Sequence, residues 1–278
     1  SLQAESFQVE ESRLRRKDLQ EKIKRLSDTY QGSFHILDCG QMDISSTQIR
    51  RMVAEKEDIS AYTPAKVVDY IRTHALYQNV TGYDIVAIEK SLQGLLSPHR
   101  YAHTLGVMHT ACALSMAHSY PMTRAQIAGL LHDCAREYRT ADLPAEAARR
   151  SIAYGEVERA MPLLLHAYVG ARRAEELYGV TDAEIQQAIW RHTVGGERMT
   201  KLDKIIYFAD MIEPQRDYPE VEALRALSRT ASLDAMVLEG LSRSIAFVLQ
   251  SGRLIQPATV AARNEILLRA RAKEGHAP

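Results

Sequence analysis

The sequence has no net charge, few cysteines and no long apolar run, and each absence excludes a class of protein. Lysine plus arginine and aspartate plus glutamate both number 35. This balance argues against a general nucleic-acid or membrane surface but allows a local basic pocket. No apolar run approaches about 18 residues, so we expect no membrane span, and the N-terminal segment lacks the apolar core of a signal peptide. The three cysteines follow no framework spacing, which predicts reduced thiols in a cytoplasmic protein.

The first 80 residues mix several short patterns. A charged helix is expected within residues 1–30, and FHILDC (34–39) is typical of a short strand. Residues 45–47 can cap a helix that starts near Gln48, and Thr63–Pro64 fits the start of a second helix. The chain does not begin with methionine, and we expect it to be a piece of a longer parent.

A break at NVTGYD (79–84) predicts a domain boundary, with a small helical or αβ segment over 1–80 and an all-α domain over 81–278. Beyond residue 84 the apolar spacing and cap residues indicate helix after helix. The signals are Ser97–Pro98, capping boxes at TRAQ (123–126), TDAE (181–184) and TKLD (200–203), Pro162 at a helix start, Gly179 at its end, and helices near 232–250 and 258–273.

Five of these predicted helices each carry a metal-binding type of side chain within or directly after an apolar stretch. A single histidine on a helix is more often a surface or core residue than a ligand. Here the residues recur at spacings of 29, 34, 26 and 18, which allows five helices to converge. The residues are His103, His132 with its neighbour Asp133, His166, His192 and Asp210.

Convergence would explain why so many polar groups follow apolar runs. Buried separately, each would need its own hydrogen-bond partner, as in an ordinary core. Placed together, they can be satisfied by divalent cations, and imidazole and carboxylate suit Fe, Mn, Co or Zn. Six ligands exceed the need of one tetrahedral zinc. They are enough for two ions with a shared carboxylate and open positions for solvent.

Six segments in order resemble one branch of the HD superfamily of metal-dependent phosphohydrolases, the symmetrical bis(5′-nucleosyl)-tetraphosphatases. The resemblance spans about residues 84–270, and one departure is Arg136, where the family often has lysine. The segments are RYAHTLGV (100–107), LLHDCARE (130–137), LLLHAYVGA (163–171), WRHTVGG (190–196), KIIYFADMIEPQRDYPEVE (204–222) and IQPATVAARN (255–264).

The resemblance implies hydrolysis of diadenosine tetraphosphate to two ADP at a di-iron centre. A metal-activated water would be the nucleophile, and His132 and Asp133 would be the catalytic residues of the site. The expected ligands, His103, His132, Asp133, His166, His192 and Asp210, are all present. Cys134 is interpreted as packing, because nothing basic apart from the ligands is placed to activate it.

A polyanionic substrate also needs cations and close backbone approach. Candidates for phosphate contacts lie within a few residues of the ligands, although each one alone is more often a surface charge or a helix stop. They are Arg100, Arg136, Lys204 and Arg216, with Thr193 and Gly195 in the glycine loop. The expected partner is a small dinucleotide, with no nucleic acid and no membrane, and a homodimer is left open.

The segment ISSTQIR (44–50) resembles the closing signature of nicotinate-nucleotide adenylyltransferases, over about residues 31–78. In that family a capped helix start presents hydroxyls, amides and an arginine to ATP phosphates, as expected of an anion site. The family's opening strand and histidine-bearing nucleotide motif are absent here. We therefore expect no adenylyltransferase activity from this chain, and a parent fused to an adenylyltransferase domain.

Two other functions remain open at this level. The first is a neighbouring HD activity, such as a 5′-nucleotidase or a cyclic-nucleotide phosphodiesterase, with the same metal site and another pocket. The second is a non-catalytic module that only binds a nucleotide. A complete ligand set argues against the second function.

Overall fold

The structure is a computed structural model, and it describes residues 21–28, 44–73, 76–77 and 82–273. The chain divides into two compact units, residues 1–44 and 45–278. In the first unit, residues 21–28 form a helix. The strand predicted at 34–39 lies outside the described residues. Within the described residues every regular element is a helix, so the mainly α prediction is confirmed.

Two short helices open the second unit where their caps predicted them. Helix α2 (Ser46–Ala54) starts with a capping box, in which the Ser45 hydroxyl accepts from the Gln48 amide and the Gln48 side chain accepts from the Ser45 amide. Helix α3 (Ala65–Thr73) follows Pro64 directly. Val68 and Ile71 of α3 are buried in a small cluster that also contains Ile59 and Met122 of α6.

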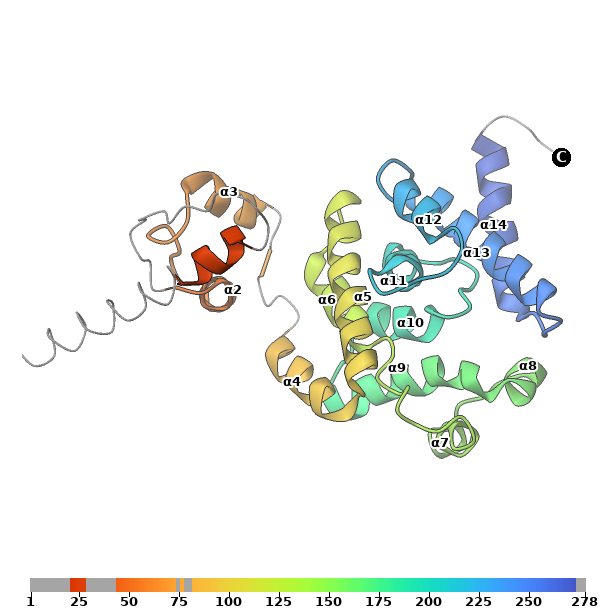
Figure 1. Cartoon of the computed structure of the whole chain (residues 1–278). Coiled ribbons are helices and arrows are strands. Elements are labelled where there is room, and N and C mark those ends of the chain that lie inside the picture. Colours follow the sequence, from red (N-terminus) through yellow and green to blue (C-terminus); the bar gives the residue numbers. More distant parts are fainter. Residues whose placement is uncertain (1–20, 29–43, 74–75, 78–81, 274–278) are drawn as a thin grey trace, which may run out of the picture. The chain divides into compact units, whose positions relative to one another are not determined.

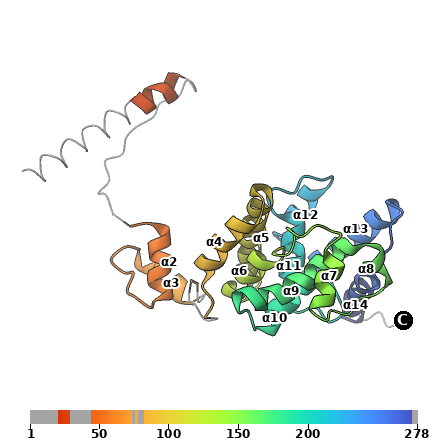
Figure 2. The same cartoon turned by 90° about the horizontal axis from the view of Figure 1, so that it is seen from below.

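The remaining helices follow in one series, which Figures 1 and 2 show from two sides. They are α4 (Ile85–Leu95), α5 (Pro98–Ala117), α6 (Met122–Leu131), α7 (Leu143–Arg149), α8 (Glu156–Ala160), the 3-10 helix η1 (Pro162–Leu164), α9 (Leu165–Tyr178), α10 (Ala183–Arg191), α11 (Lys201–Ile212), α12 (Val221–Leu227), α13 (Leu233–Gln250) and α14 (Pro257–Lys273). None of the helices in the described residues is long and apolar enough to cross a bilayer.

The cap predictions hold at most helix starts and fail at two. Thr200 caps α11 in the TKLD capping box, and Gly179 ends α9 with a left-handed φ of 64°. In TDAE the capping side chain is Asp182, one residue later than the threonine. The TRAQ capping box is wrong: α6 begins at Met122, two residues earlier than predicted, so Thr123 lies inside the first turn.

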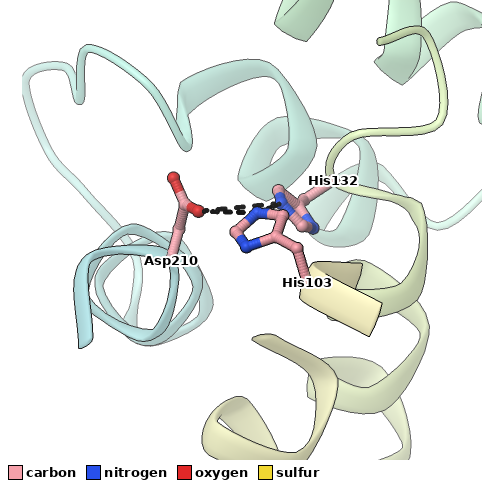
Figure 3. Close-up of side chains that lie close together, drawn as sticks. All are labelled: His103, His132 and Asp210. Carbon is pink, nitrogen blue, oxygen red and sulfur yellow. Dashed lines mark hydrogen bonds and ion pairs between the residues drawn. The ribbon is translucent and has the colours of Figure 1, made fainter. Parts of the chain in front are cut away.

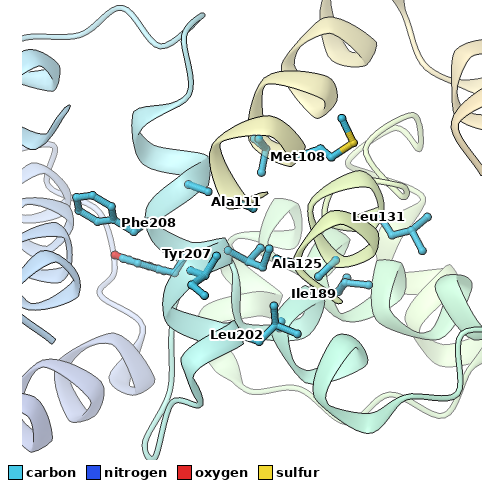
Figure 4. Packing of buried hydrophobic residues seen from close by; sticks show 14 of the residues in the cluster. Met108, Ala111, Ala125, Leu131, Ile189, Leu202, Tyr207 and Phe208 are labelled. Atoms are coloured by element: carbon cyan, nitrogen blue, oxygen red, sulfur yellow. The ribbon is translucent and has the colours of Figure 1, made fainter. Parts of the chain in front are cut away.

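The core lies where α5, α6, α10 and α11 meet. Helix α5 packs against α6 and α11, while α10 packs against α9, α6 and α11. Buried side chains from each of them, such as Leu131, Ile189 and Phe208, form one cluster (Figure 4). Because this cluster holds all four helices rigidly, side chains at their ends can be placed within a few ångströms of one another.

One glycine sets the separation of α5 and α6. A Cβ atom on Gly129 would lie 2.8 Å from the Met108 Cα, closer than real Cβ atoms come. Only glycine therefore lets the two backbones approach this closely. On α9 and α10, Tyr168 stacks on Trp190 with ring centroids 4.3 Å apart.

Candidate metal centre

The six predicted ligands come together from five helices. His103 lies in the second turn of α5, His166 in the first turn of α9 and Asp210 in the last turn of α11. His132 and His192 are the C-cap residues of α6 and α10, so each ring is presented where its helix ends. Asp133 follows immediately after α6. Five of the six are buried, and Asp210 is half-buried.

One group, which we call the His103 half, consists of His103, His132 and Asp210 (Figure 3). The Nε2 atoms of His103 and His132 lie 3.2 Å apart. The Asp210 Oδ1 lies 3.2 Å from the His103 Nε2 and 3.8 Å from the His132 Nε2. Three donor atoms of metal-ligand type thus face one point.

The second group of possible ligand atoms joins His132, Asp133 and His192. We call His192 and its neighbour His166 the His166 half. Their Nε2 atoms also lie 3.2 Å apart. Asp133 spans the two halves: its Oδ1 lies 3.2 Å from the His166 Nε2, and its Oδ2 lies 3.9 Å from the His132 Nε2. Asp133 therefore has the geometry of a shared carboxylate.

Each ring is oriented by the nitrogen that faces away from the centre. The His132 Nδ1 is 2.7 Å from the Gly129 carbonyl oxygen, and the His192 Nδ1 is 2.7 Å from the Ile189 carbonyl oxygen. The His166 Nδ1 is 2.5 Å from the Leu163 carbonyl oxygen. A carbonyl oxygen can only accept, so these Nδ1 atoms carry the proton and each neutral ring turns an Nε2 lone pair inward.

The facing lone pairs fit a metal ion. Two unprotonated Nε2 atoms at 3.2 Å repel each other, and both ring pairs show this arrangement. A positive charge between the two atoms would turn this repulsion into coordination. The donors are imidazole nitrogen and carboxylate oxygen, which suit Fe, Mn, Co and Zn. The residues present therefore fit divalent metal ions.

The pKa shifts of the histidines also indicate that the centre favours positive charge. Burial acts to lower the pKa of His103, but the Asp210 and Glu213 carboxylates outweigh it and raise that pKa. Burial also opposes the raised pKa of His192, which Asp133 causes. Burial lowers the pKa of His132 to about 4, which keeps that ring neutral. One ring of each facing pair thus attracts a proton, as it would attract a metal ion.

Both carboxyl groups are held ionised. Burial acts to raise the pKa of Asp133, but the His132, His166 and His192 imidazoles hold it well below its usual range. The pKa of Asp210 is lowered in the same way, against burial, by His103 and Arg216. Ionised carboxylates are the form that binds a cation.

Comparisons with known proteins agree with this geometry. The HD domain family matches residues 100–215. The "Bis(5'-nucleosyl)-tetraphosphatase, symmetrical" of Halalkalibacterium halodurans is 36% identical over 178 residues, 62% of this chain and 91% of that relative. This chain belongs to the HD-domain family of hydrolases.

Two further relatives bear on this HD hydrolase. A crystal structure of a "predicted HD superfamily hydrolase involved in NAD metabolism" from Clostridium acetobutylicum superposes with a TM-score of 0.64 at 33% identity, covering 67% of this chain and 98% of that chain. The "Probable nicotinate-nucleotide adenylyltransferase/Ap4A hydrolase" of Mycoplasma pneumoniae is 34% identical over 157 residues, which are 56% of this chain but 42% of that relative.

The arginine candidates of the HD hydrolase differ in how closely they approach the ligands. The Arg216 Nε donates to the Asp210 backbone oxygen at 2.7 Å, and its Nη2 donates to the Asp210 carboxylate. The Arg136 Nε lies 3.5 Å from the Asp133 Oδ2. Arg100 lies in the first turn of α5. Burial raises the pKa of the Glu137 carboxyl, and the nearby Arg100 guanidinium partly opposes this rise.

The other candidates are placed as follows. The Thr193 hydroxyl lies 3.1 Å from the His192 Nε2 and 3.3 Å from the His166 Nε2, directly at the centre. Gly195 has a left-handed φ of 71°, and its amide bonds to the Arg191 carbonyl as in a helix stop. The Lys204 Nζ donates to the Asp234 carboxylate at 2.6 Å. Burial raises the pKa of the Cys134 thiol to about 12, consistent with packing.

The sequence pattern missed Glu213, which is buried behind His103. Its Oε1 lies 3.0 Å from the His103 Nδ1, so His103 is oriented by a carboxylate where the other three rings are oriented by carbonyl groups. The available signal was its position three residues after Asp210, one turn along the same segment.

Proposed function

We propose that this HD hydrolase cleaves diadenosine tetraphosphate symmetrically, consuming one water and releasing two ADP. The observation that carries the proposal is that four imidazole Nε2 atoms and two carboxylates meet in two adjoining groups. The symmetrical tetraphosphatase relative from Halalkalibacterium halodurans suggests the substrate.

We infer that the six residues hold two metal ions, divalent or trivalent, with Asp133 between them. Such ions, when bound, supply water of near-neutral pKa and neutralise charge that builds on phosphoryl oxygens. Iron is the first choice by resemblance, and Mn, Co and Zn suit the same donors. In this proposal His132 contributes a neutral imidazole and Asp133 an ionised carboxylate as metal ligands beside the reacting phosphate.

Basic side chains of this chain, together with Thr193 and Gly195, would orient the phosphates. Arg136 and Thr193 lie beside ligand atoms and are proposed to contact the central phosphate groups. Arg100, Gly195, Lys204 and Arg216 stay predicted contacts. Of these, Lys204 and Arg216 are already bound to carboxylates, which favours a role in holding the site.

A cavity whose wall includes Leu163, the residue that orients the His166 ring, is proposed to receive one nucleoside. It has a volume of about 450 Å³ and is lined mainly by apolar side chains of η1 and of the turn between α13 and α14, including Leu163 and Leu254. Leu163 also fixes the His166 ring through its carbonyl oxygen. Leu163 of the cavity wall and the candidate ligand His166 are three residues apart in the chain.

We further propose the domain division at residue 80, with an adenylyltransferase-like segment over 1–80 and the HD domain over 81–278. The double name of the Mycoplasma pneumoniae relative supports a parent fused to an adenylyltransferase. We still expect no turnover of nicotinate mononucleotide with ATP by this chain. A homodimer remains a prediction, checked by light scattering.

The test is an assay of anaerobically purified protein paired with metal analysis. Diadenosine tetraphosphate should yield ADP alone, with about two metal ions per chain. Equal amounts of AMP and ATP would refute symmetrical cleavage. Faster hydrolysis of a 5′-mononucleotide or a cyclic nucleotide under the same conditions would favour a neighbouring HD activity.

A further inference from the structure

Glu213 is a buried carboxylate that touches one metal-ligand ring from behind. Its side chain is 1% exposed. The Oε1 accepts from the His103 Nδ1 at 3.0 Å, and the Oε2 accepts from the Gln215 amide at 2.8 Å. Both oxygens are therefore engaged, and neither is available to solvent.

The surroundings hold this carboxylate in one place. A Cβ atom on Gly106, one turn after His103 on α5, would collide with the Glu213 Oε2. Arg225 of α12 holds the backbone at Glu213 in place, because it donates to the carbonyl oxygens of Ile212 at 2.9 Å and of Glu213 at 2.7 Å. The position of the carboxylate is thus set from α5, α11 and α12.

We propose that Glu213 is a positioning residue that fixes the tautomer of His103 and thereby secures the metal position of the His103 half selectively. An ionised carboxylate can only accept, and the Gln215 amide can only donate. The His103 Nδ1 must therefore carry a proton, which leaves the Nε2 lone pair directed at Asp210 and the centre. The inference rests on the proposed two-metal function but concerns metal retention, which is measured without substrate.

Glutamine at this position cannot serve both donors. Its amide has one oxygen and one NH₂ group. If the oxygen accepts from the fixed Gln215 amide, the NH₂ group faces the His103 Nδ1 and favours the tautomer with its proton on Nε2. That tautomer cannot ligate a metal through Nε2, so the replacement of one oxygen by an NH₂ group tests the claim with little change of shape.

The experiment measures metal per chain by mass spectrometry after dialysis, and binding constants by titration with Mn²⁺. We expect wild-type protein to hold about two ions, and Glu213→Gln to bind one of them about 10- to 100-fold more weakly while it retains the other. Gly106→Ala, which displaces the carboxylate without removing it, should give the same selective loss. Circular dichroism melting verifies that both variants are folded.

The matched control is Glu158, a glutamate that is equally enclosed but remote from the ligands. It is 3% exposed and accepts from Tyr168 at 2.9 Å and from Gln256 at 2.6 Å. Glu158→Gln should retain both ions. Equal retention by Glu213→Gln and wild type, or loss of both ions, would overturn the inference. Failure of wild-type protein to cleave diadenosine tetraphosphate would overturn the proposed substrate, and selective loss in Glu213→Gln would still stand.

Discussion

The His103 half and the His166 half each bring two imidazole Nε2 atoms together but are supported differently. The rings of His166 and His192 are held by backbone carbonyl oxygens. In the His103 half, Glu213 holds one ligand and Arg216 holds another through side-chain contacts. Backbone support changes only if the helices move, whereas side-chain support can be removed by one substitution. The His103 half is therefore the one that mutation can weaken alone.

The largest effect is expected where the halves meet. Asp133→Ala removes the carboxylate that spans them, so we expect both ions to be lost and kcat to fall at least about 1,000-fold, since metal ions supply several kcal/mol to such reactions. The measurement is metal content together with ADP release. His109→Ala, an exposed histidine on the same helix as His103, should leave both unchanged. Wild-type metal content in Asp133→Ala would show that the site lies elsewhere.

Removing metal should reveal whether the halves bind in sequence. An ion present at about 1,000 times its dissociation constant stabilises the folded chain by about 4 kcal/mol. A chelator should thus lower the Tm by about 8–16 °C for a domain of this size. On stepwise return of Mn²⁺, we expect the Tm to rise in two phases, because the two supports differ. A Tm that changes with neither chelator nor added Mn²⁺ would contradict the proposed metal centre.

Arg216→Met should weaken one half only. The guanidinium neutralises and orients Asp210, and loss of such an outer contact costs about 10- to 100-fold in metal affinity. Titration should show one weakened and one unchanged position. Arg139→Met is the control, because its ion pair with Asp142 lies on the surface. Equal weakening of both positions would mean that the halves are not separable.

The smallest effect is expected at the cavity lined by Leu163 and Leu254. Leu254→Asp places a charge in an apolar wall, which should raise KM by about 3- to 10-fold with kcat and metal content unchanged, as when uniform binding is lost. Leu268→Asp, an exposed position of α14 that does not line the cavity, should leave KM unchanged. An unaltered KM in Leu254→Asp would exclude this cavity as a nucleoside site.

Much of the helical order and the convergence of the six candidate ligands could be predicted because they leave local traces. Prolines, glycines and capping residues mark helix ends, and apolar runs lead directly into His132, His166 and Asp210. The failure at TRAQ shows the limit of this reasoning: a threonine and glutamine at the right spacing do not cap a helix that has already begun. Arg136 likewise follows a tight turn after α6 rather than a further helical turn.

Contacts that depend on packing left no such trace. Glu213 resembles any acidic residue near a helix end until α5 places His103 beside it. Lys204 looks like a free cation until α13 brings Asp234 within 2.6 Å. Both outcomes depend on how helices distant in sequence approach each other, and that is set by the whole core.

The stacked pair of Tyr168 and Trp190 gives this molecule a built-in optical probe. Trp190 is the one tryptophan of the chain, and each ring stands two residues from an imidazole of the His166 half. A quenching ion such as Fe or Mn in the His166 half would lower the fluorescence intensity of Trp190, and an ion in the His103 half would lower it less. Intrinsic fluorescence can therefore follow the loading of a single position in unlabelled protein.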